Sequence, residues 1–295
     1  MTIEETLLEG WRLLEAPSPS ALIEAPALDA SLLLGEVLRK SRTELLAHGD
    51  DSLSEEQRDQ FFALIQRRLG GECTAYILGR KEFRALDFIV NPSVLVPRPD
   101  TETLVEVVLE LSNARQDLID RGAVKDKGRS LLDLCTGSGA LAISVKNERP
   151  FFDVTASDIS AAALETAELN ARQLLGDKNN IRFIHSDLFQ NIDGRFDIIV
   201  SNPPYIASGE MSALPPEVRR EPPLALDGGK DGLAIIRRII ERASGHLTDG
   251  GLLLLEADPR QMMAIRRLLT ARRFGCITVF QDLAGLDRAI AGAAW

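Results

Sequence analysis

The tetrapeptide Asn202-Pro203-Pro204-Tyr205 carries the most specific chemical signal in this chain. It follows residues 196–201, an apolar stretch typical of a buried strand. Two consecutive prolines cannot continue a helix or a central strand, so they hold the backbone in a rigid, extended turn. The turn displays an amide, a proline carbonyl and an aromatic face, which together can grip a planar NH2 group. This set favours methylation of an amide or aminopurine nitrogen, and an ordinary proline-rich turn is the alternative for the tetrapeptide alone.

A glycine loop upstream has the composition of a cofactor-binding turn. Asp133 lies at the end of a strand predicted at 130–134, and Thr136, Gly137 and Gly139 follow in the loop. The two glycines permit a tight turn and close approach of the backbone to a ligand, and the helix that follows offers its free N–H groups. We therefore assign these four residues to cofactor binding.

Carboxylates also follow the next two predicted strands. Asp158 ends a strand predicted at 153–157, where it can accept both hydroxyls of a ribose. Such charge-assisted hydrogen bonds contribute about 1.5–3 kcal/mol each. Asp187 and Leu188 follow a strand predicted at 181–185, and Asp187 is placed for an adenine amino group. Three carboxylates at successive strand ends beside one glycine loop predict a site for an adenosine-containing cofactor.

A competing interpretation of the glycine loop is a dinucleotide site. Residues 137–142 fit the pattern G-x-G-x-x-A, and Asp158 follows at about the distance seen in dinucleotide-binding folds. That motif is weak by itself, and an oxidoreductase has no use for the tetrapeptide at Asn202. Asp133, moreover, lies where it can anchor the ammonium of a sulfonium amino acid. A methyltransferase therefore explains more of the sequence.

The elements that must position these residues belong to an α/β domain. From about residue 130 onward, strand and helix patterns alternate, which indicates a mainly parallel sheet. Prolines and charges fill the stretch 207–223, which is long for a connection between a strand and a helix and predicts a functional loop or lid. Strands are expected at 130–134, 153–157, 181–185, 196–201, 251–256 and 275–280, and helices at about 140–147, 160–175, 232–246 and 259–272.

The N-terminal part of the chain has a different pattern. Residues 1–70 show apolar residues at helical spacing, with helix starts expected at Ser41 and Ser54. Residues 76–98 predict two strands that form a β-hairpin with its turn at 91–93. The sequence therefore predicts a helical domain joined by a hairpin to the α/β domain.

Composition narrows the function classes. The chain has 295 residues and a net charge of −10 from 34 basic and 44 acidic side chains, which argues against a broad grip on nucleic acid. Its three cysteines and three histidines are scattered and make no metal-ligand spacing, so no metal site is expected. No signal peptide pattern and no apolar run of roughly 18–20 residues is present, so we expect a cytoplasmic protein without membrane association.

Together these motifs resemble the HemK/PrmC family of protein-(glutamine-N5) methyltransferases, and the likeness spans nearly the whole chain. Three departures stand out: Asp100 replaces the usual Glu of the family's PRPETE segment, Cys135 replaces a usual Gly, and residues 256–258 read Glu-Ala-Asp where Glu-Ile-Gly is usual. The matching segments are 76–83, 96–102, 133–139, 158–160, 202–205, 221–233 and 282–288.

The resemblance implies a class I S-adenosylmethionine-dependent methyltransferase fold with a mostly parallel, seven-stranded sheet. It implies a helical substrate-docking domain at 1–72, a linker with the β-hairpin at 73–98 and a Rossmann-like methyltransferase domain at 99–295. The implied cofactor is S-adenosyl-L-methionine, and the implied partners are class 1 peptide chain release factors, methylated on the Gln of a Gly-Gly-Gln loop. Apart from the resemblance, we expect a monomer that does not bind nucleic acid directly.

For the reaction, we expect Asn202 Oδ1 and the Pro203 carbonyl each to accept one N–H of the substrate amide. Tyr205 is expected to stack on the amide plane or line the methyl channel, and Pro204 to complete the substrate site. Three rival functions stay open: methylation of a Gln in a ribosomal protein, methylation of adenine N6 in nucleic acid, and an inactive module that docks on release factors.

Overall fold

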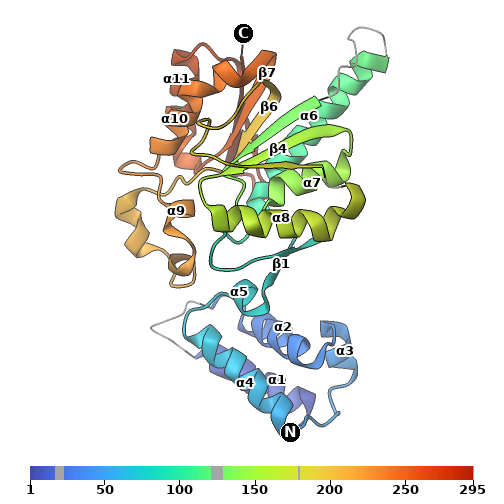
Figure 1. Ribbon diagram of the computed structural model, residues 1–295. Helices are drawn as coiled ribbons and strands as arrows, with labels where there is room; N and C mark the ends of the chain where they lie inside the picture. The colour runs from blue at the N-terminus through green and yellow to red at the C-terminus, as the bar shows by residue number, and fades with distance from the viewer. Residues whose placement is uncertain (17–22, 121–128, 179, 295) are drawn as a thin grey trace. The chain divides into compact units, whose positions relative to one another are not determined.

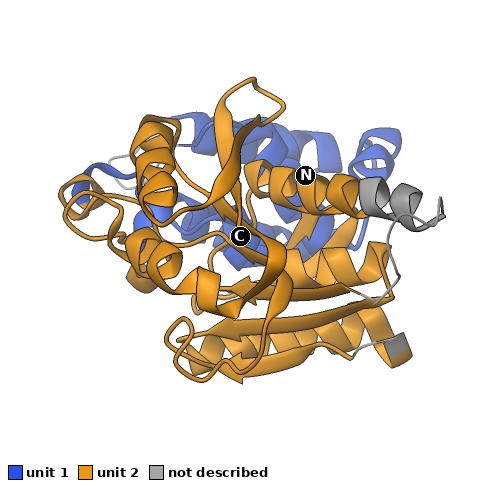
Figure 2. Cartoon of the chain, turned by 90° about the horizontal axis from the view of Figure 1, so that it is seen from above, with its two compact units in different colours: residues 1–80, 212–221 blue, residues 81–211, 222–295 orange. Residues whose placement is uncertain are grey.

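The computed structural model describes residues 1–16, 23–120, 129–178 and 180–294 (Figure 1). The chain forms two compact units (Figure 2). Unit 1 contains residues 1–80 together with 212–221, and unit 2 contains residues 81–211 and 222–295. The domain limits expected from the sequence remain a prediction, and each unit is described below by itself.

Unit 1 is helical, and the sequence explains where its helices begin. Ser41 and Ser54 each accept a backbone N–H at N3 while the Glu or Gln at N3 bonds back, which confirms both predicted helix starts. Thr2 caps the first helix in the same way. A buried cluster that includes Leu33 and Phe61 forms the core. The helices are α1 (Ile3–Glu15), α2 (Pro26–Leu38), α3 (Arg42–Ala47), α4 (Glu55–Leu69) and α5 (Thr74–Leu78).

A buried arginine ties the late segment 212–221 to the helices of unit 1. Arg68 donates to Asp29 and to Glu217, with N–O distances of 2.7 Å in both cases. Two carboxylates around one guanidinium satisfy a charge that would be costly to bury alone. The stretch 207–223, which was expected to be a functional loop or lid, contains short helical turns rather than irregular chain. They are η3 (Ser208–Ala213), η4 (Val218–Arg220) and the start of α9 (Pro223–Leu226).

A β-hairpin forms within residues 76–98, but the predicted turn and second strand were wrong, because residues 94–96 are not a strand. The strands are β1 (Arg80–Phe83) and β2 (Leu86–Ile89), and the turn between them is Arg84-Ala85. Both turn residues have positive φ, of 48° and 57°, as a two-residue hairpin turn of type I′ requires. Residues that favour this conformation, such as Asn-Gly, are absent, so the sequence carried no turn signal. Residues 91–93 form a separate turn after the hairpin, where Asn91 Oδ1 accepts from Ser93 N at 2.9 Å.

Unit 2 contains a seven-stranded sheet in the order β5-β4-β3-β6-β7-β9-β8. The first five strands in this order are parallel, and β9 is antiparallel to both of its neighbours. This confirms the expected fold class. The strands are β3 (Arg129–Leu134), β4 (Phe152–Asp158), β5 (Arg182–His185), β6 (Phe196–Ser201), β7 (Leu247–Glu256), β8 (Gly275–Gln281) and β9 (Asp287–Ala293).

Two hydrophobic layers cover the sheet, one on each face. Alternate residues of the same strand enter opposite layers: Leu131 packs with one cluster and Leu132 with the other. The first layer includes α6 (Glu102–Asp120), α7 (Ala140–Glu148) and α8 (Ala161–Leu175), and the second includes α10 (Ala234–Ala243) and α11 (Met262–Ala271) (Figure 1). Among the described residues, no helix has the length and apolar character needed to cross a bilayer.

Candidate active site

A cavity opens in unit 2 at the carboxyl ends of the parallel strands, where open α/β sheets bind their ligands. The loops after β3, β4, β5 and β6 all contribute to its lining. Six of the residues predicted for the site line this cavity: Gly137, Asp158, Asp187, Leu188, Asn202 and Pro204. The fold therefore brings the predicted cofactor loop and the diproline turn to one place.

The glycine loop has the conformations that its composition predicted. Gly137 and Gly139 have φ values of 55° and 81°, and a Cβ built on Gly137 would meet no atom within 4 Å. Gly137 therefore leaves open space for a ligand to approach its backbone. Gly139 has a packing role instead, because a Cβ there would lie 2.8 Å from Ile143 Cδ1. Cys135 also has a positive φ, of 60°, which explains why Gly is the residue expected there.

Asp158 fits the role of a ribose ligand while it also holds the glycine loop. Its Oδ2 accepts from Gly137 N and its Oδ1 from Ser160 N, both at 2.9 Å. A carboxylate offers about four acceptor positions, so about two remain for hydroxyl groups in the cavity. Burial raises the pKa of Asp158, and the two backbone N–H bonds oppose that rise.

Asp133 and Thr136 lie behind the cavity rather than in its lining. Asp133 is 1% exposed, and its Oδ2 accepts from Thr136 Oγ1 at 2.6 Å and from Ala142 N at 3.3 Å. Burial raises the pKa of Asp133 to about 7. The carboxyl thus joins the loop to the start of α7, and its expected contact with an ammonium group stays a prediction.

Asp187 is in the cavity lining but is already paired with a cation. Its Oδ2 lies 2.7 Å from Arg238 Nη2, and Arg238 lines the cavity as well. Both side chains are partly exposed, so solvent weakens the pair. The expected contact of Asp187 with an adenine amino group is a prediction that this geometry permits, because a carboxylate has further acceptor positions.

The diproline turn is held by residues that the sequence reasoning did not select. Asn202 Nδ2 donates to Thr101 Oγ1 at 3.1 Å, and the Tyr205 hydroxyl donates to Glu256 Oε1 at 3.4 Å. Tyr205 therefore points its hydroxyl toward the end of β7, and neither Tyr205 nor Pro203 lines the cavity. Thr101 and Glu256 were missed because they are far from the turn in sequence. A signal existed for Glu256, which ends an apolar strand at the same sheet edge as the other site residues.

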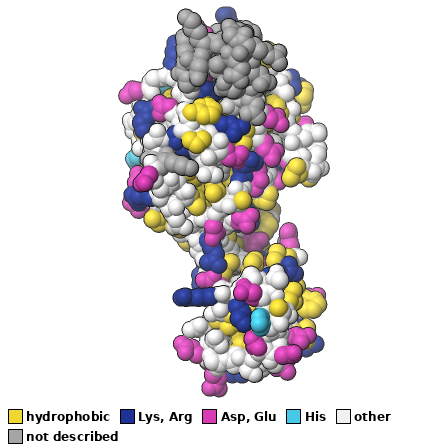
Figure 3. All heavy atoms as spheres, turned by 90° about the vertical axis from the view of Figure 1, so that its right-hand side faces the viewer, with side chains coloured by type: hydrophobic (Ala, Val, Ile, Leu, Met, Phe, Trp, Pro, Cys, Tyr) yellow, Lys and Arg dark blue, Asp and Glu magenta, His cyan; other side chains and the backbone are white. Residues whose placement is uncertain are grey.

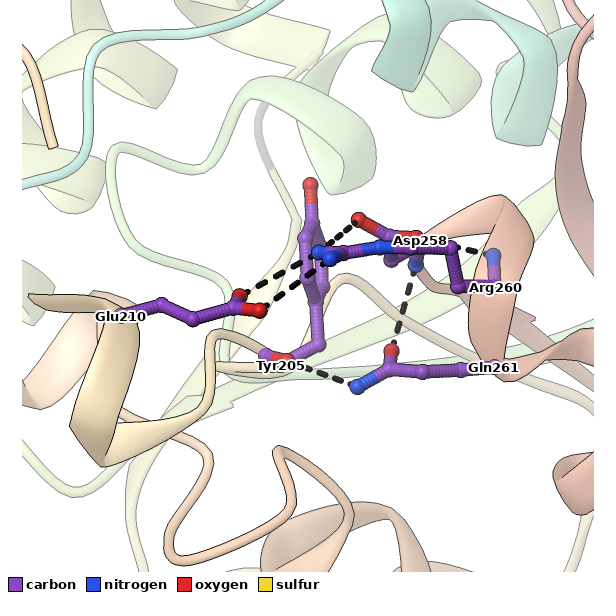
Figure 4. A network of polar contacts seen from close by, with 5 residues as sticks. All are labelled: Tyr205, Glu210, Asp258, Arg260 and Gln261. Carbon is purple, nitrogen blue, oxygen red and sulfur yellow. Dashed lines mark hydrogen bonds and ion pairs between the residues drawn. The ribbon is translucent and has the colours of Figure 1, made fainter. Parts of the chain in front are cut away.

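A polar network anchors the chain that follows the turn (Figure 4). Gln261 Nε2 donates to the backbone oxygen of Tyr205 at 2.9 Å. The guanidinium of Arg260 lies between two carboxylates, 3.1 Å from Glu210 and 2.9 Å from Asp258. Asp258, one of the departures from the family pattern, also accepts from the backbone N of Arg260 at 2.8 Å. The unusual Asp therefore caps the short helix η6 (Pro259–Gln261) and orients Arg260 toward Glu210.

Comparisons with known proteins show which family the chain belongs to. Residues 19–79 match the family model "PrmC N-terminal domain", and residues 113–214 match "Methyltransferase small domain". The chain is 42% identical to the release factor glutamine methyltransferase of Neisseria gonorrhoeae, over 92% of this chain and 94% of that protein. It is 40% identical to the one from Moorella thermoacetica, over 98% and 97%. The chain belongs to the release factor glutamine methyltransferase family.

Membership in the release factor glutamine methyltransferase family makes this chain a methyltransferase and sets aside the dinucleotide interpretation of the glycine loop. Among solved structures, the catalytic domain of hMettl16 in complex with a 3′UTR hairpin superposes with a TM-score of 0.57 at 15% identity, over 79% of this chain and 82% of that one. At this identity the likeness supports the shared fold alone.

Gly228 and Gly232, in the family segment 221–233, pack directly against the backbone of the diproline turn. Substitution of Gly232 tests whether this packing matters. A Cβ on Gly232, whose φ is 72°, would lie 2.2 Å from the Tyr205 carbonyl oxygen. A Cβ on Gly228 would lie 2.7 Å from the Pro204 oxygen. We expect Gly232→Ala to lower both methyl-transfer activity and the thermal unfolding temperature, because the turn must shift to make room.

Gly209→Ala is the matched control, because a Cβ there would meet no atom within 4 Å. Calorimetric unfolding and methyl transfer at saturating cofactor measure both effects. If Gly232→Ala and Gly209→Ala behave alike, the seating of the turn by Gly232 is wrong.

Proposed function

We propose that this chain transfers a methyl group from S-adenosyl-L-methionine to the side-chain nitrogen N5 of the Gln in the Gly-Gly-Gln loop of class 1 peptide chain release factors. The observation that carries the proposal is the placement of Asn202 and Pro204 in the same cavity lining as Gly137 and Asp158. Support also comes from the relatives, which are named release factor glutamine methyltransferases.

The residues of the cavity fit the proposed cofactor. Gly137 leaves its backbone open to the ligand, Asp158 keeps acceptor positions for the ribose hydroxyls, and Leu188 offers an apolar surface to the adenine. When bound, S-adenosylmethionine supplies a methyl carbon attached to a positively charged sulfur. In this proposal Asp133, Thr136 and Gly139 do not line the cavity but hold the glycine loop in its conformation.

The chain's own contribution to the reaction is to hold a weak nucleophile in place. An amide nitrogen reacts poorly because its lone pair is delocalised into the carbonyl. Asn202 Oδ1 and the Pro203 carbonyl each accept one N–H of the substrate amide in this proposal, which orients the nitrogen and raises its electron density. Positioning of this kind contributes roughly 7–11 kcal/mol in well-oriented reactions. Tyr205 acts from behind the turn, through its bond to Glu256.

The charge of the protein argues against a nucleic-acid substrate. On the described part of the face in Figure 3, basic side chains are interspersed with acidic and apolar ones, which is unlike the continuous basic surface of most nucleic-acid enzymes. The net charge of −10 points the same way. A ribosomal protein bearing a reactive Gln is the harder rival, because its chemistry would be identical.

Transfer of labelled methyl from S-adenosylmethionine to purified proteins tests the proposal. We expect a class 1 release factor to be labelled on its Gly-Gly-Gln loop, and a Gln→Ala variant of that loop to stay unlabelled. Peptide mass spectrometry locates the added methyl. Labelling of isolated ribosomal proteins with no labelling of the release factor would overturn the proposed substrate.

A further inference from the structure

Glu256 is a buried carboxyl whose surroundings imply more than a structural role. It ends β7 at the sheet edge that carries the site, and it is 1% exposed. Its Oε1 accepts from the Tyr205 hydroxyl, whereas its Oε2 has no hydrogen-bond partner among the described residues. Buried carboxyl oxygens are rarely left unpaired, so each such exception calls for an explanation.

Thr101 connects this carboxyl to the amide of Asn202. Its hydroxyl lowers the pKa of Glu256, as a donor near a carboxylate does, and its oxygen accepts from Asn202 Nδ2 at 3.1 Å. A hydroxyl has one hydrogen to donate, and an ionised carboxylate can only accept. The Thr101 hydrogen is therefore directed to Glu256, and the oxygen of Thr101 is left to accept from Asn202.

This ordering has a consequence for Asn202, whose amide can present either its oxygen or its nitrogen to the cavity. With Thr101 acting as acceptor, the NH2 end of Asn202 is held on the Thr101 side. The Oδ1 end is then free to face the cavity that Asn202 lines. An amide turned the other way would present a donor to the NH2 group of a substrate, which cannot accept from it.

We propose that Glu256 and Thr101 are positioning residues that fix the amide orientation of Asn202, so that its carbonyl oxygen faces the substrate nitrogen. The proposal rests on the proposed function, since it deepens the description of the same site. Neither residue lines the cofactor cavity. Both act through Asn202 rather than by touching the reacting atoms.

The charge on Glu256 makes the arrangement sensitive to pH. Burial raises the pKa of Glu256 to about 7; the Thr101 hydroxyl, Arg288 and Tyr205 oppose that rise, and Asp100 adds to it. Arg288, on β9, is itself bonded to Asp100 at 3.0 Å and Asp282 at 3.1 Å. Above the pKa the carboxylate can only accept. Below it, the carboxyl can donate to Thr101, and the orientation of Asn202 is no longer enforced.

The matched pair Thr101→Val and Thr101→Ser tests the relay, because Val keeps the shape but loses the hydroxyl and Ser keeps the hydroxyl. At saturating cofactor, we expect Thr101→Val to lower kcat by about tenfold or more, as loss of a transition-state contact does. Thr101→Ser should stay within about threefold, and calorimetry should give the same cofactor Kd for both within about threefold. If Ser is as damaging as Val, or if Val leaves kcat unchanged, the relay is refuted.

The pH profile and a spectrum of the enzyme without substrate supply a second readout. Wild-type kcat should rise through about pH 7 and Glu256→Gln should remove that rise, since the amide does not ionise. The side-chain 15N–1H resonances of Asn202, assigned by their loss in Asn202→Ala, should titrate in wild type and not in Glu256→Gln. If the Asn202 resonances titrate in both the wild type and Glu256→Gln, the proposal is overturned. If the wild-type resonances titrate but release factor is not methylated, the proposed function fails and the positioning pair stands.

Discussion

Asn202→Ala is expected to lower methyl transfer to the release factor by at least about 10²–10³-fold, the usual cost of removing one preorganised polar contact to the reacting group. Asn202 is the only side chain of the diproline turn that combines a hydrogen-bonding amide with a place in the cavity lining. Its loss removes an acceptor for the substrate N–H and leaves the turn backbone intact. The measurement is single-turnover transfer of labelled methyl at saturating cofactor.

The cofactor affinity of the same variant provides the control. We expect calorimetry to show a Kd for S-adenosylmethionine within a few-fold of wild type, since the loop at Gly137 and Asp158 is unchanged. A tenfold or greater loss of cofactor affinity would show that Asn202 mainly holds the cofactor rather than the substrate amide.

The strand ends explain why so much of this site was predictable from the sequence. In a parallel sheet the carboxyl ends of neighbouring strands meet at one edge, so polar residues directly after apolar runs are brought together. Asp158, Asp187 and Asn202 each follow such a run, and the structure places all three in one cavity lining. Each of these residues lies within a few positions of its strand in the sequence, so its place at the sheet edge could be predicted from the local pattern alone.

The features that were missed depend on contacts between distant segments. Strand β9 was not predicted because Ala289, Ala291 and Gly292 have low strand propensity, and only its place between β7 and β8 makes it a strand. The hairpin turn at Arg84-Ala85 was missed because it lacks the usual turn residues. A contact from a distant segment supports it instead, since Glu102, from a later helix, accepts from Arg84 N at 3.3 Å. Tertiary contacts overrode local preference in both cases.

The hydrogen-bond partners of the diproline turn also could not be predicted, because they come from distant parts of the sequence. Thr101 and Asn202 are about one hundred residues apart in the chain, and no pattern in either segment indicates the other. Both segments match motifs of the family that the sequence resembles, but a motif match does not show that the two segments are in contact. Which polar group faces which partner is therefore information that the fold supplies.

Asp158→Ala is expected to have the opposite profile from Asn202→Ala, with cofactor binding lost first. The substitution removes two charge-assisted hydrogen bonds to ribose hydroxyls, which contribute about 1.5–3 kcal/mol each. Their loss should weaken cofactor binding by at least about 100-fold. The change also leaves the Gly137 and Ser160 N–H groups without their carboxylate acceptor, so the loop that approaches the cofactor becomes less rigid. Calorimetry with S-adenosylmethionine and with S-adenosylhomocysteine measures the effect, and kcat at saturating cofactor should fall far less.

Asp153→Ala is the matched control, because Asp153 is an exposed carboxylate on the same strand, β4, and makes only a loose pair with Arg182 at 3.7 Å. We expect its cofactor affinity to equal that of wild type, because an exposed pair at this distance contributes little. Equal affinities for Asp158→Ala and Asp153→Ala would refute the ribose assignment. A loss of cofactor affinity at Asp158 alone, with Asn202→Ala still able to bind, would separate the two halves of the site: one carboxylate that holds the nucleoside and one amide that presents the substrate nitrogen.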